Sequence, residues 1–147
     1  MEEKQQYATF NLAGSYFGIS VGTVQEILRM QQMTPVPLAP SVVSGLINLR
    51  GQIVTAVDLR RRLGMVERDL GAAPVNVVIR SNGGIISLLV DEIGDVVEVS
   101  EDTFEPPPET LSSKAREMVR GVHKLNRRLM HVLDTDKVTS EFSEVAR

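Results

Sequence analysis

The stretch GLINLRGQIVTAVDLRRRLG, residues 45–64, places the polar tetrapeptide NLRG between two runs of apolar residues. Short apolar runs on both sides of a turn signal are typical of a β-hairpin. We therefore predict one strand over 44–50 and a second over 52–58, with the turn in the NLRG tetrapeptide.

The second strand of this hairpin has apolar side chains on both faces, since Val54 and Val57 point to opposite sides of it. A strand covered on both faces is central in a sheet rather than half exposed. Asp58 then has the right side chain to cap a short helix over 59–63, and Gly64 suits the left-handed backbone that ends such a helix.

The rest of the chain repeats this rhythm of short apolar runs, broken by Gly, Pro, Asn or Asp at intervals of about ten residues. Such a rhythm is typical of a barrel or sandwich of short strands, so we predict a mainly β fold. A proline-rich connector over 34–40 and a stiff loop over 104–108 interrupt it. Further strands are expected at 7–12, 16–21, 24–29, 75–80, 85–90, 96–99, 119–125 and 128–133.

The expected core lies on these strands, and a helix is expected at the end of the chain. Asp134 would cap this helix, and Val138, Phe142 and Val145 would form its apolar stripe. The residues that we expect to be buried in the strands are Val54, Val57, Ile79, Leu88 and Leu133.

Composition narrows the class of function. The chain has 147 residues, no cysteine and a net charge of -3, so disulfides and thiolate metal sites are excluded. An acidic chain has no global basic field for phosphate backbones, and we expect no nucleic-acid partner. The charged start MEEKQQ has no apolar signal region, and no apolar run approaches the roughly 20 residues of a membrane span. We expect a cytoplasmic protein without direct membrane insertion.

Residues able to support catalysis are few, because the chain has two histidines and no HExxH, GxSxG or Walker motif. His123 and His131 lie on the two strands of one predicted hairpin, where they could approach each other, but a metal site would need further ligands. We interpret them as ordinary strand histidines. The sequence thus predicts no catalytic residue, no metal, no cofactor and no enzyme activity.

Two charged clusters have simple interpretations. Asp91, Glu92 and Asp95 lack the alternating spacing of a calcium-binding loop, so we interpret them as a solvated loop. The three arginines at 60–62 lack the interleaved aromatic residues of an RNA-binding surface, so we interpret them as a solvated helix face.

Arg50 has two interpretations. A guanidinium beside a buried strand needs a charged partner, and Glu26 in the strand predicted over 24–29 is the candidate. The planar fork of arginine can engage this carboxylate and still present an N–H edge outward. In the alternative, Arg50 is a hairpin-turn residue in water, and the residue pattern alone leaves both open.

Four blocks of the chain resemble, in order, the successive blocks of the CheW coupling proteins of bacterial chemotaxis: TFNLAGSYFGISVGTVQEILR, TPVPLAPSVVSGLINLRGQIVTAVDLRRRLG, LLVDEIGDVVEV and GVHKLNRRLMHVLDTDKV. NLRG followed by an apolar strand and DLR is highly specific for that family. The resemblance implies two five-stranded, SH3-like β-barrels on a shared hydrophobic core, with short helices near 59–63 and 134–145.

The same resemblance implies a single domain over 1–147. Its approximate sub-barrels would be 7–65 and 75–133, with the C-terminal helix packing back on them.

The resemblance also implies a non-enzymatic adaptor, cytoplasmic and recruited to receptor arrays at the inner membrane. Such proteins couple the helical cytoplasmic tips of chemoreceptors to the regulatory domain of a CheA-type histidine kinase. Two alternatives stay open: the same module in a non-flagellar chemosensory pathway, or a stand-alone barrel that senses a small ligand. Carried over to this chain, the receptor-facing groove would fall on Val24, Glu26, Gly45, Asn48 and Arg50, with Val43 nearby by position. Glu26 and Arg50 would form a structural ion pair there.

Overall fold

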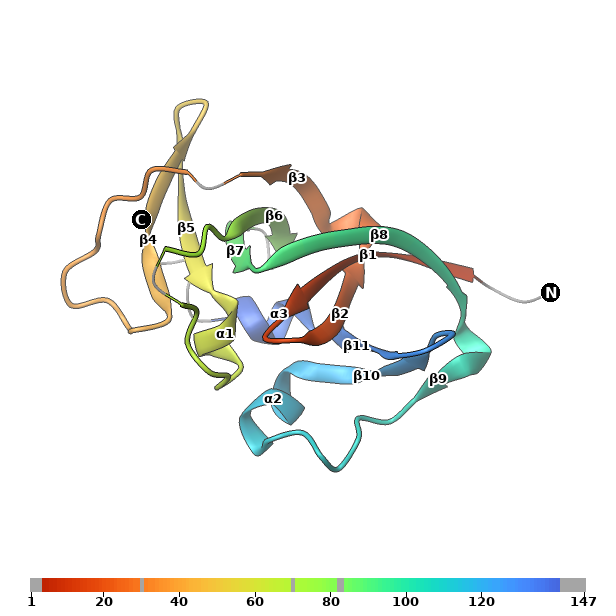
Figure 1. The fold of residues 1–147 in the computed structure, drawn as a ribbon. Helices are drawn as coiled ribbons and strands as arrows, with labels where there is room; N and C mark the ends of the chain where they lie inside the picture. The colour runs from red at the N-terminus through yellow and green to blue at the C-terminus, as the bar shows by residue number, and fades with distance from the viewer. Residues whose placement is uncertain (1–3, 30, 70, 82–83, 141–147) are drawn as a thin grey trace.

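A computed structural model of the chain describes residues 4–29, 31–69, 71–81 and 84–140. Strands dominate these residues and form two sheets, with short helices beside them (Figure 1). The expected mainly β fold is confirmed.

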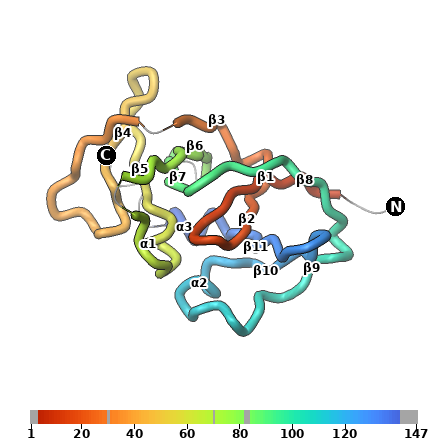
Figure 2. Tube along the Cα trace, viewed as in Figure 1, coloured from red at the N-terminus to blue at the C-terminus, as the bar shows by residue number. Residues whose placement is uncertain are grey.

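One sheet has six strands in the order β8-β1-β2-β11-β10-β9. Its first hairpin joins β1 and β2 antiparallel, and Figure 2 shows β8, from the second half of the chain, lying along the other side of β1. The strands are β1 (Lys4–Leu12), β2 (Ser15–Ser20), β8 (Glu92–Ser100), β9 (Phe104–Glu105), β10 (Val119–Lys124) and β11 (Leu129–Leu133).

The other sheet has five strands in the order β3-β6-β7-β5-β4. Strands β3 and β4 are its two edges, although the chain passes directly from one to the other through the proline-rich connector. The strands are β3 (Val24–Leu28), β4 (Val43–Leu49), β5 (Gln52–Asp58), β6 (Val75–Ser81) and β7 (Gly84–Val90).

Both sheets share one pairing pattern. Two antiparallel hairpins are joined by a parallel pair, β2 with β11 in one sheet and β5 with β7 in the other. An antiparallel edge strand, β8 or β3, completes five strands in each. The sixth strand, β9, has only 2 residues. Except for this short strand, the expected pair of five-stranded units is present.

The two sheets do not follow the division of the chain into 7–65 and 75–133. Strands β1 and β2 belong with β8 to β11, while β3 to β7 form the other sheet. The physical reason is the parallel pairing of β2 with β11, in which Phe17 lies opposite His131. This pairing places the β1–β2 hairpin beside the β10–β11 hairpin. Sequence distance is therefore a poor guide to the units of this fold.

A shared hydrophobic core lies between the sheets. Phe10 and Phe17 from the six-stranded sheet pack in one cluster with Val57 and Ile79 from the five-stranded sheet. A second, separate hydrophobic cluster, which includes Tyr7, lies within the six-stranded sheet. All five residues expected in the core are 3% exposed or less, namely Val54, Val57, Ile79, Leu88 and Leu133.

The helices are short. The expected one after Asp58 is present as α1 (Leu59–Arg62), with the Asp58 side chain accepting a hydrogen bond from the backbone N–H of Arg61. The expected C-terminal helix is described as α3 (Thr135–Thr139), with Asp134 as its cap. Its proposed stripe residues Phe142 and Val145 lie outside the described residues.

The sequence did not predict α2 (Ser113–Met118), which Ser112 caps and which buries Ala115 and Met118. Single 3₁₀ turns, η1 (Val21–Thr23) and η2 (Glu101–Thr103), connect strands. Among the described residues no helix is long and apolar enough to span a membrane.

Candidate functional site

The NLRG tetrapeptide forms the tight end of the β4–β5 hairpin. Leu49 pairs with Gln52, leaving Arg50 and Gly51 as a two-residue turn with φ values of 53° and 86°. Two successive positive φ angles define the type I′ turn that suits the twist of a hairpin. The side-chain oxygen of Asn48 accepts a hydrogen bond of 2.9 Å from the N–H of Gly51, which holds the turn.

Arg50 reaches from this turn to Glu26 on β3. Its Nη1 donates to Glu26 Oε2 at 2.9 Å and its Nη2 to Oε1 at 2.6 Å, a bidentate pair. Because β3 and β4 are the two edges of the five-stranded sheet, the pair spans the opening between them. Thr34 and Leu46 close the same opening with two backbone hydrogen bonds of 2.8 Å. The expected ion pair is therefore present, and it joins the two sheet edges.

The pair faces water. The Arg50 side chain is 79% exposed and that of Glu26 is 23% exposed, so Arg50 is both paired with Glu26 and a hairpin-turn residue in water. Hydrogen bonding and the charge of Glu26 raise the pKa of Arg50, which keeps it cationic. An exposed pair adds little to stability, so its consequence is a guanidinium held in one orientation at the surface.

The remaining expected groove residues have different surroundings. Val24 and Val43 begin the two edge strands, are partly buried, and pack against the shared core. Gly45 lies against the connector, where an added Cβ would sit 2.8 Å from the carbonyl oxygen of Thr34. The structure thus brings Asn48, Arg50 and Glu26 together at the hairpin end. Val43 lies at the other end of the hairpin, where it pairs with Val57, and both valines pack on the core rather than on the ion pair.

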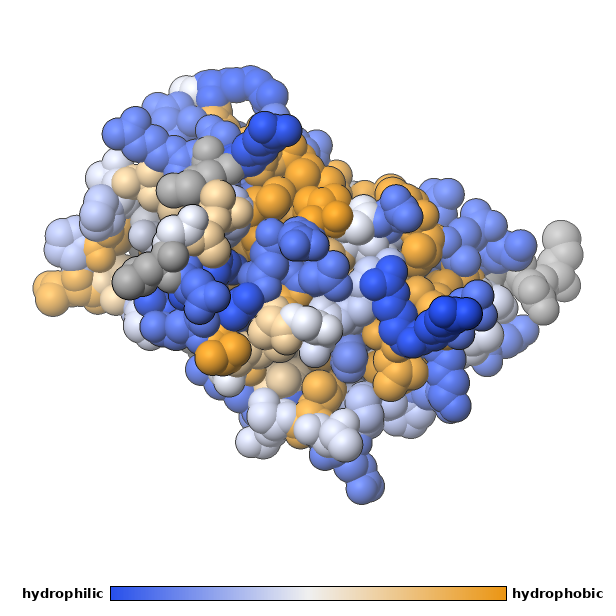
Figure 3. All heavy atoms as spheres, in the orientation of Figure 1, coloured by the Kyte–Doolittle hydropathy of each residue, from blue (hydrophilic) through white to orange (hydrophobic). Residues whose placement is uncertain are grey.

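Sequence reasoning missed the exposed apolar residues of this region. Ile53 of β5 is 47% exposed and Ile27 of β3 is 44% exposed. The strand over 52–58 was expected to be covered on both faces, but Ile53 is the second residue after the turn, near the exposed end of the hairpin. Figure 3 shows a hydrophobic area beside the hydrophilic end of the hairpin. A groove of about 730 Å³ follows the hairpin here, lined by Gln31, Gln32, Thr34, Leu46, Ile47, Asn48 and Ile53.

A second arginine–carboxylate cluster joins the two sheets. Asp91, between β7 and β8, accepts hydrogen bonds from Arg60 Nε at 2.9 Å and from the backbone N–H of Ala13 at 2.8 Å. Arg68 Nη2 lies 3.2 Å from Asp91 Oδ1, the oxygen atom that Arg60 Nε also contacts. Burial acts to raise the pKa of Asp91, but these donors outweigh burial and lower it. The interpretation of Asp91 as part of a solvated loop is wrong.

The arginine triplet is not a solvated face either. Arg60 is only 14% exposed and binds Asp91. Arg61 donates to the carbonyl of Ser41 at 2.8 Å, and Arg62 donates to the carbonyl of Val138 at 3.0 Å. Each arginine fastens a different segment to α1, because a one-turn helix points its successive side chains in different directions.

The two histidines do not meet. His123 pairs with Met130 and His131 with Val122, so their side chains point to opposite faces of the hairpin. His123 is fully buried, and burial lowers its pKa. His131 packs on Phe17. Their separate packing agrees with ordinary strand histidines, and the described residues contain no group of three residues that could hold a metal ion.

Comparisons with known proteins agree on one family. A family model described as a CheW-like domain matches residues 6–143. The chemotaxis protein CheW of Rhizobium meliloti is 32% identical over 97% of this chain and 92% of its own length. The probable chemotaxis protein CheW of Rhizobium etli is 29% identical over 93% of this chain and 88% of its own length.

A solved structure supports the same assignment. The scaffolding protein TtCheW from Thermoanaerobacter tengcongensis superposes with a TM-score of 0.81 at 26% identity, over 90% of each chain. The match extends across both sheets rather than one of them. The chain belongs to the CheW-like domain family.

Proposed function

We propose that this protein is a non-enzymatic adaptor that couples the helical tips of chemoreceptors to the regulatory domain of a CheA-type histidine kinase. Membership of the CheW-like domain family and similarity to a protein described as scaffolding support the general role. The observation that carries the receptor-binding part is the exposed bidentate pair of Arg50 with Glu26 beside a groove.

The groove suits an amphipathic helix. Ile53 and Ile27 offer apolar surface for the apolar stripe of a receptor helix. Arg50 directs its remaining N–H groups outward and orients the partner by charge or hydrogen bonding. Under this proposal Val24 and Val43 anchor the two edge strands in the core, Gly45 lets the connector lie close to β4 behind the groove, and Asn48 fixes the turn.

The kinase would bind a different surface, since a bridge between two proteins needs both sites free at once. The shared core supports treating the whole chain as one domain that carries both surfaces rigidly. The adaptor would work in the cytoplasm and join receptor arrays at the inner membrane through the receptor. It would need no catalytic residue, metal or cofactor.

The direct test is reconstitution. The full chain is mixed with a receptor cytoplasmic fragment and a kinase regulatory domain from the same organism, and complexes are separated by size-exclusion chromatography. The proposal expects receptor and kinase domain to co-elute only when the chain is added. Binding of neither partner, or of one partner only in competition with the other, would reject the adaptor role.

A further inference from the structure

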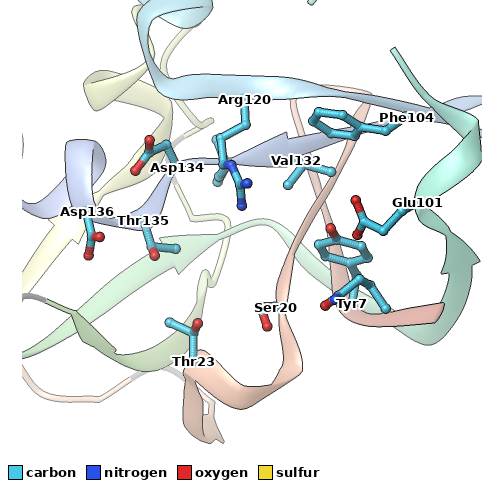
Figure 4. Close-up of a pocket in the computed structure, with 12 residues that line it drawn as sticks. Tyr7, Ser20, Thr23, Glu101, Phe104, Arg120, Val132, Asp134, Thr135 and Asp136 are labelled. Carbon is cyan, nitrogen blue, oxygen red and sulfur yellow. The ribbon is translucent and has the colours of Figure 1, made fainter. Parts of the chain in front are cut away.

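A polar cavity lies away from the Arg50 groove, at one end of the six-stranded sheet. It has a volume of about 490 Å³ and is walled by that sheet, by the turns η1 and η2, and by the start of α3 (Figure 4). The proposed receptor-binding groove does not include it. Its lining residues are Gln5, Tyr7, Ser20, Thr23, Glu101, Phe104, Arg120, Val132, Leu133, Asp134, Thr135 and Asp136.

Two opposite charges face this cavity without neutralising each other. Arg120 comes from β10 and Glu101 from η2, and Figure 4 shows the Arg120 guanidinium directed into the space between Glu101 and α3. Within the described part of the chain, neither side chain forms an ion pair or a hydrogen bond with another group. The cavity therefore offers one free cation and one free anion on separate walls.

The other carboxylates in the wall are engaged within the protein. Asp134 accepts a hydrogen bond from the backbone N–H of Lys137 at 3.1 Å as the cap of α3. Asp136 accepts a hydrogen bond from the hydroxyl of Ser81 at 2.5 Å. Glu101 is thus the carboxylate available to a ligand.

Tyr7 provides a polar group between the two charges. The residue as a whole is only 6% exposed, but its hydroxyl is not one of the buried unpaired polar atoms of the described residues, so this oxygen reaches the open space of the cavity. Burial and the charge of Glu101 raise the pKa of Tyr7, while the charge of Arg120 lowers it. Both charges are therefore close enough to act on this hydroxyl, which stays protonated and can donate a hydrogen bond.

The aromatic wall behind the hydroxyl is held rigidly. The ring of buried His123 packs against Tyr7 and Phe104, with centroid distances of 5.7 and 5.1 Å. The Thr103 hydroxyl donates to the carbonyl of Ser100 at 2.9 Å, so it must accept from His123 Nδ1, also at 2.9 Å. This contact fixes the imidazole, and a fixed wall lowers the cost of ordering on ligand binding.

We propose that this cavity binds a small zwitterion of the α-amino acid class. The carboxylate of the ligand would pair with Arg120 and its ammonium group with Glu101, while the Tyr7 hydroxyl donates to the carboxylate. A simple anion would meet the repulsion of Glu101, Asp134 and Asp136, and a simple cation would leave the Arg120 guanidinium without a partner. Only a ligand with both charges satisfies both walls.

The first experiment screens the full chain by thermal shift against the twenty free L-amino acids, and measures the best one by isothermal titration calorimetry. A site occupied at 100 times its Kd stabilises the fold by about 2.7 kcal/mol, so binding raises the melting temperature visibly. The matched deaminated acid and decarboxylated amine are titrated alongside, and we expect both to bind at least tenfold more weakly.

Variants then assign the charges. Arg120→Ala and Glu101→Gln change exposed side chains, so the fold should survive, and each should weaken binding of the amino acid by tenfold or more. Arg127→Ala and Glu98→Gln alter exposed residues outside the cavity and should leave affinity unchanged. The proposal is overturned if no amino acid stabilises the protein, if both charge variants retain affinity, or if the deaminated acid binds equally well.

Discussion

The molecule contains two bidentate arginine–carboxylate pairs in opposite settings. Arg60 and Asp91 lie between the two sheets, with side chains 14% and 18% exposed. Arg50 and Glu26 lie at a hairpin end, and Arg50 is 79% exposed. The chemistry is the same, but the solvent differs: the partly buried pair can contribute to holding the two sheets together, whereas the exposed pair adds little to stability and, under our proposal, presents a guanidinium to a partner.

Removing the buried charge should have the largest effect. Asp91→Asn leaves Arg60 and Arg68 without their shared carboxylate between the sheets, and we expect a loss of about 3 kcal/mol in the free energy of unfolding. Urea denaturation of Asp91→Asn and of Glu26→Gln compares their free energies of unfolding. Loss of the exposed pair in Glu26→Gln should lower stability far less. Equal losses would contradict the division of roles.

Two glycines near the exposed pair give the next contrast. Gly45→Ala places a methyl group 2.8 Å from the Thr34 carbonyl, so the connector must move away from β4, at a cost of about 2 kcal/mol. Gly51→Ala meets no atom within 4 Å and should cost only about 1 kcal/mol, for its left-handed backbone. Thermal unfolding of both variants tests the order, and a reversed order would mean that the close approach at Gly45 is relaxed.

A smaller effect should appear with pH. Burial lowers the pKa of His123 in the folded state, whereas in the unfolded state this histidine has a pKa of roughly 6.5. Below that pH the unfolded state therefore binds more protons than the folded state. Stability should be full above that pH and decrease on acidification toward pH 5. The ionisation of Asp91 does not contribute in this window, because its pKa is lowered from an already acidic value. Denaturant unfolding at pH 7.5 and 5.0 measures the change.

The control for the pH effect is His123→Gln, which removes the titrating group. Its absolute stability is expected to fall, but the difference between pH 7.5 and 5.0 should shrink. A wild-type protein that is equally stable at both pH values, or a variant with an undiminished difference, would contradict the assignment to His123.

The strands and the core were predictable because their signals are local. Apolar residues on both faces of one strand marked Val54 and Val57 as buried, and both are. The sheet partners were not predictable, since the parallel pairing of Phe17 with His131 joins residues from opposite ends of the chain. The helix α2 lacks a long apolar stripe, and only its cap Ser112 gave a local signal.

The two ion pairs differ in the same way. An arginine between apolar runs required a partner, which led to Glu26 for Arg50. Asp91 and Arg60 each have charged neighbours in the sequence, so no local pattern indicated that they are shielded from solvent. Their burial arises only when the β7–β8 connection crosses from one sheet to the other over α1.

The central claim is that Glu26 holds Arg50 for a receptor to contact, and a double-mutant cycle on receptor binding tests it most directly. Arg50→Ala and Glu26→Ala should each weaken binding to a receptor cytoplasmic fragment by about tenfold, and the double variant should lose little more. Binding to the kinase regulatory domain should stay unchanged in all three, and Arg127→Ala, in another hairpin turn, should bind both partners normally. Unchanged receptor binding in the single variants, or equal loss of both partners from folded protein, would contradict the account.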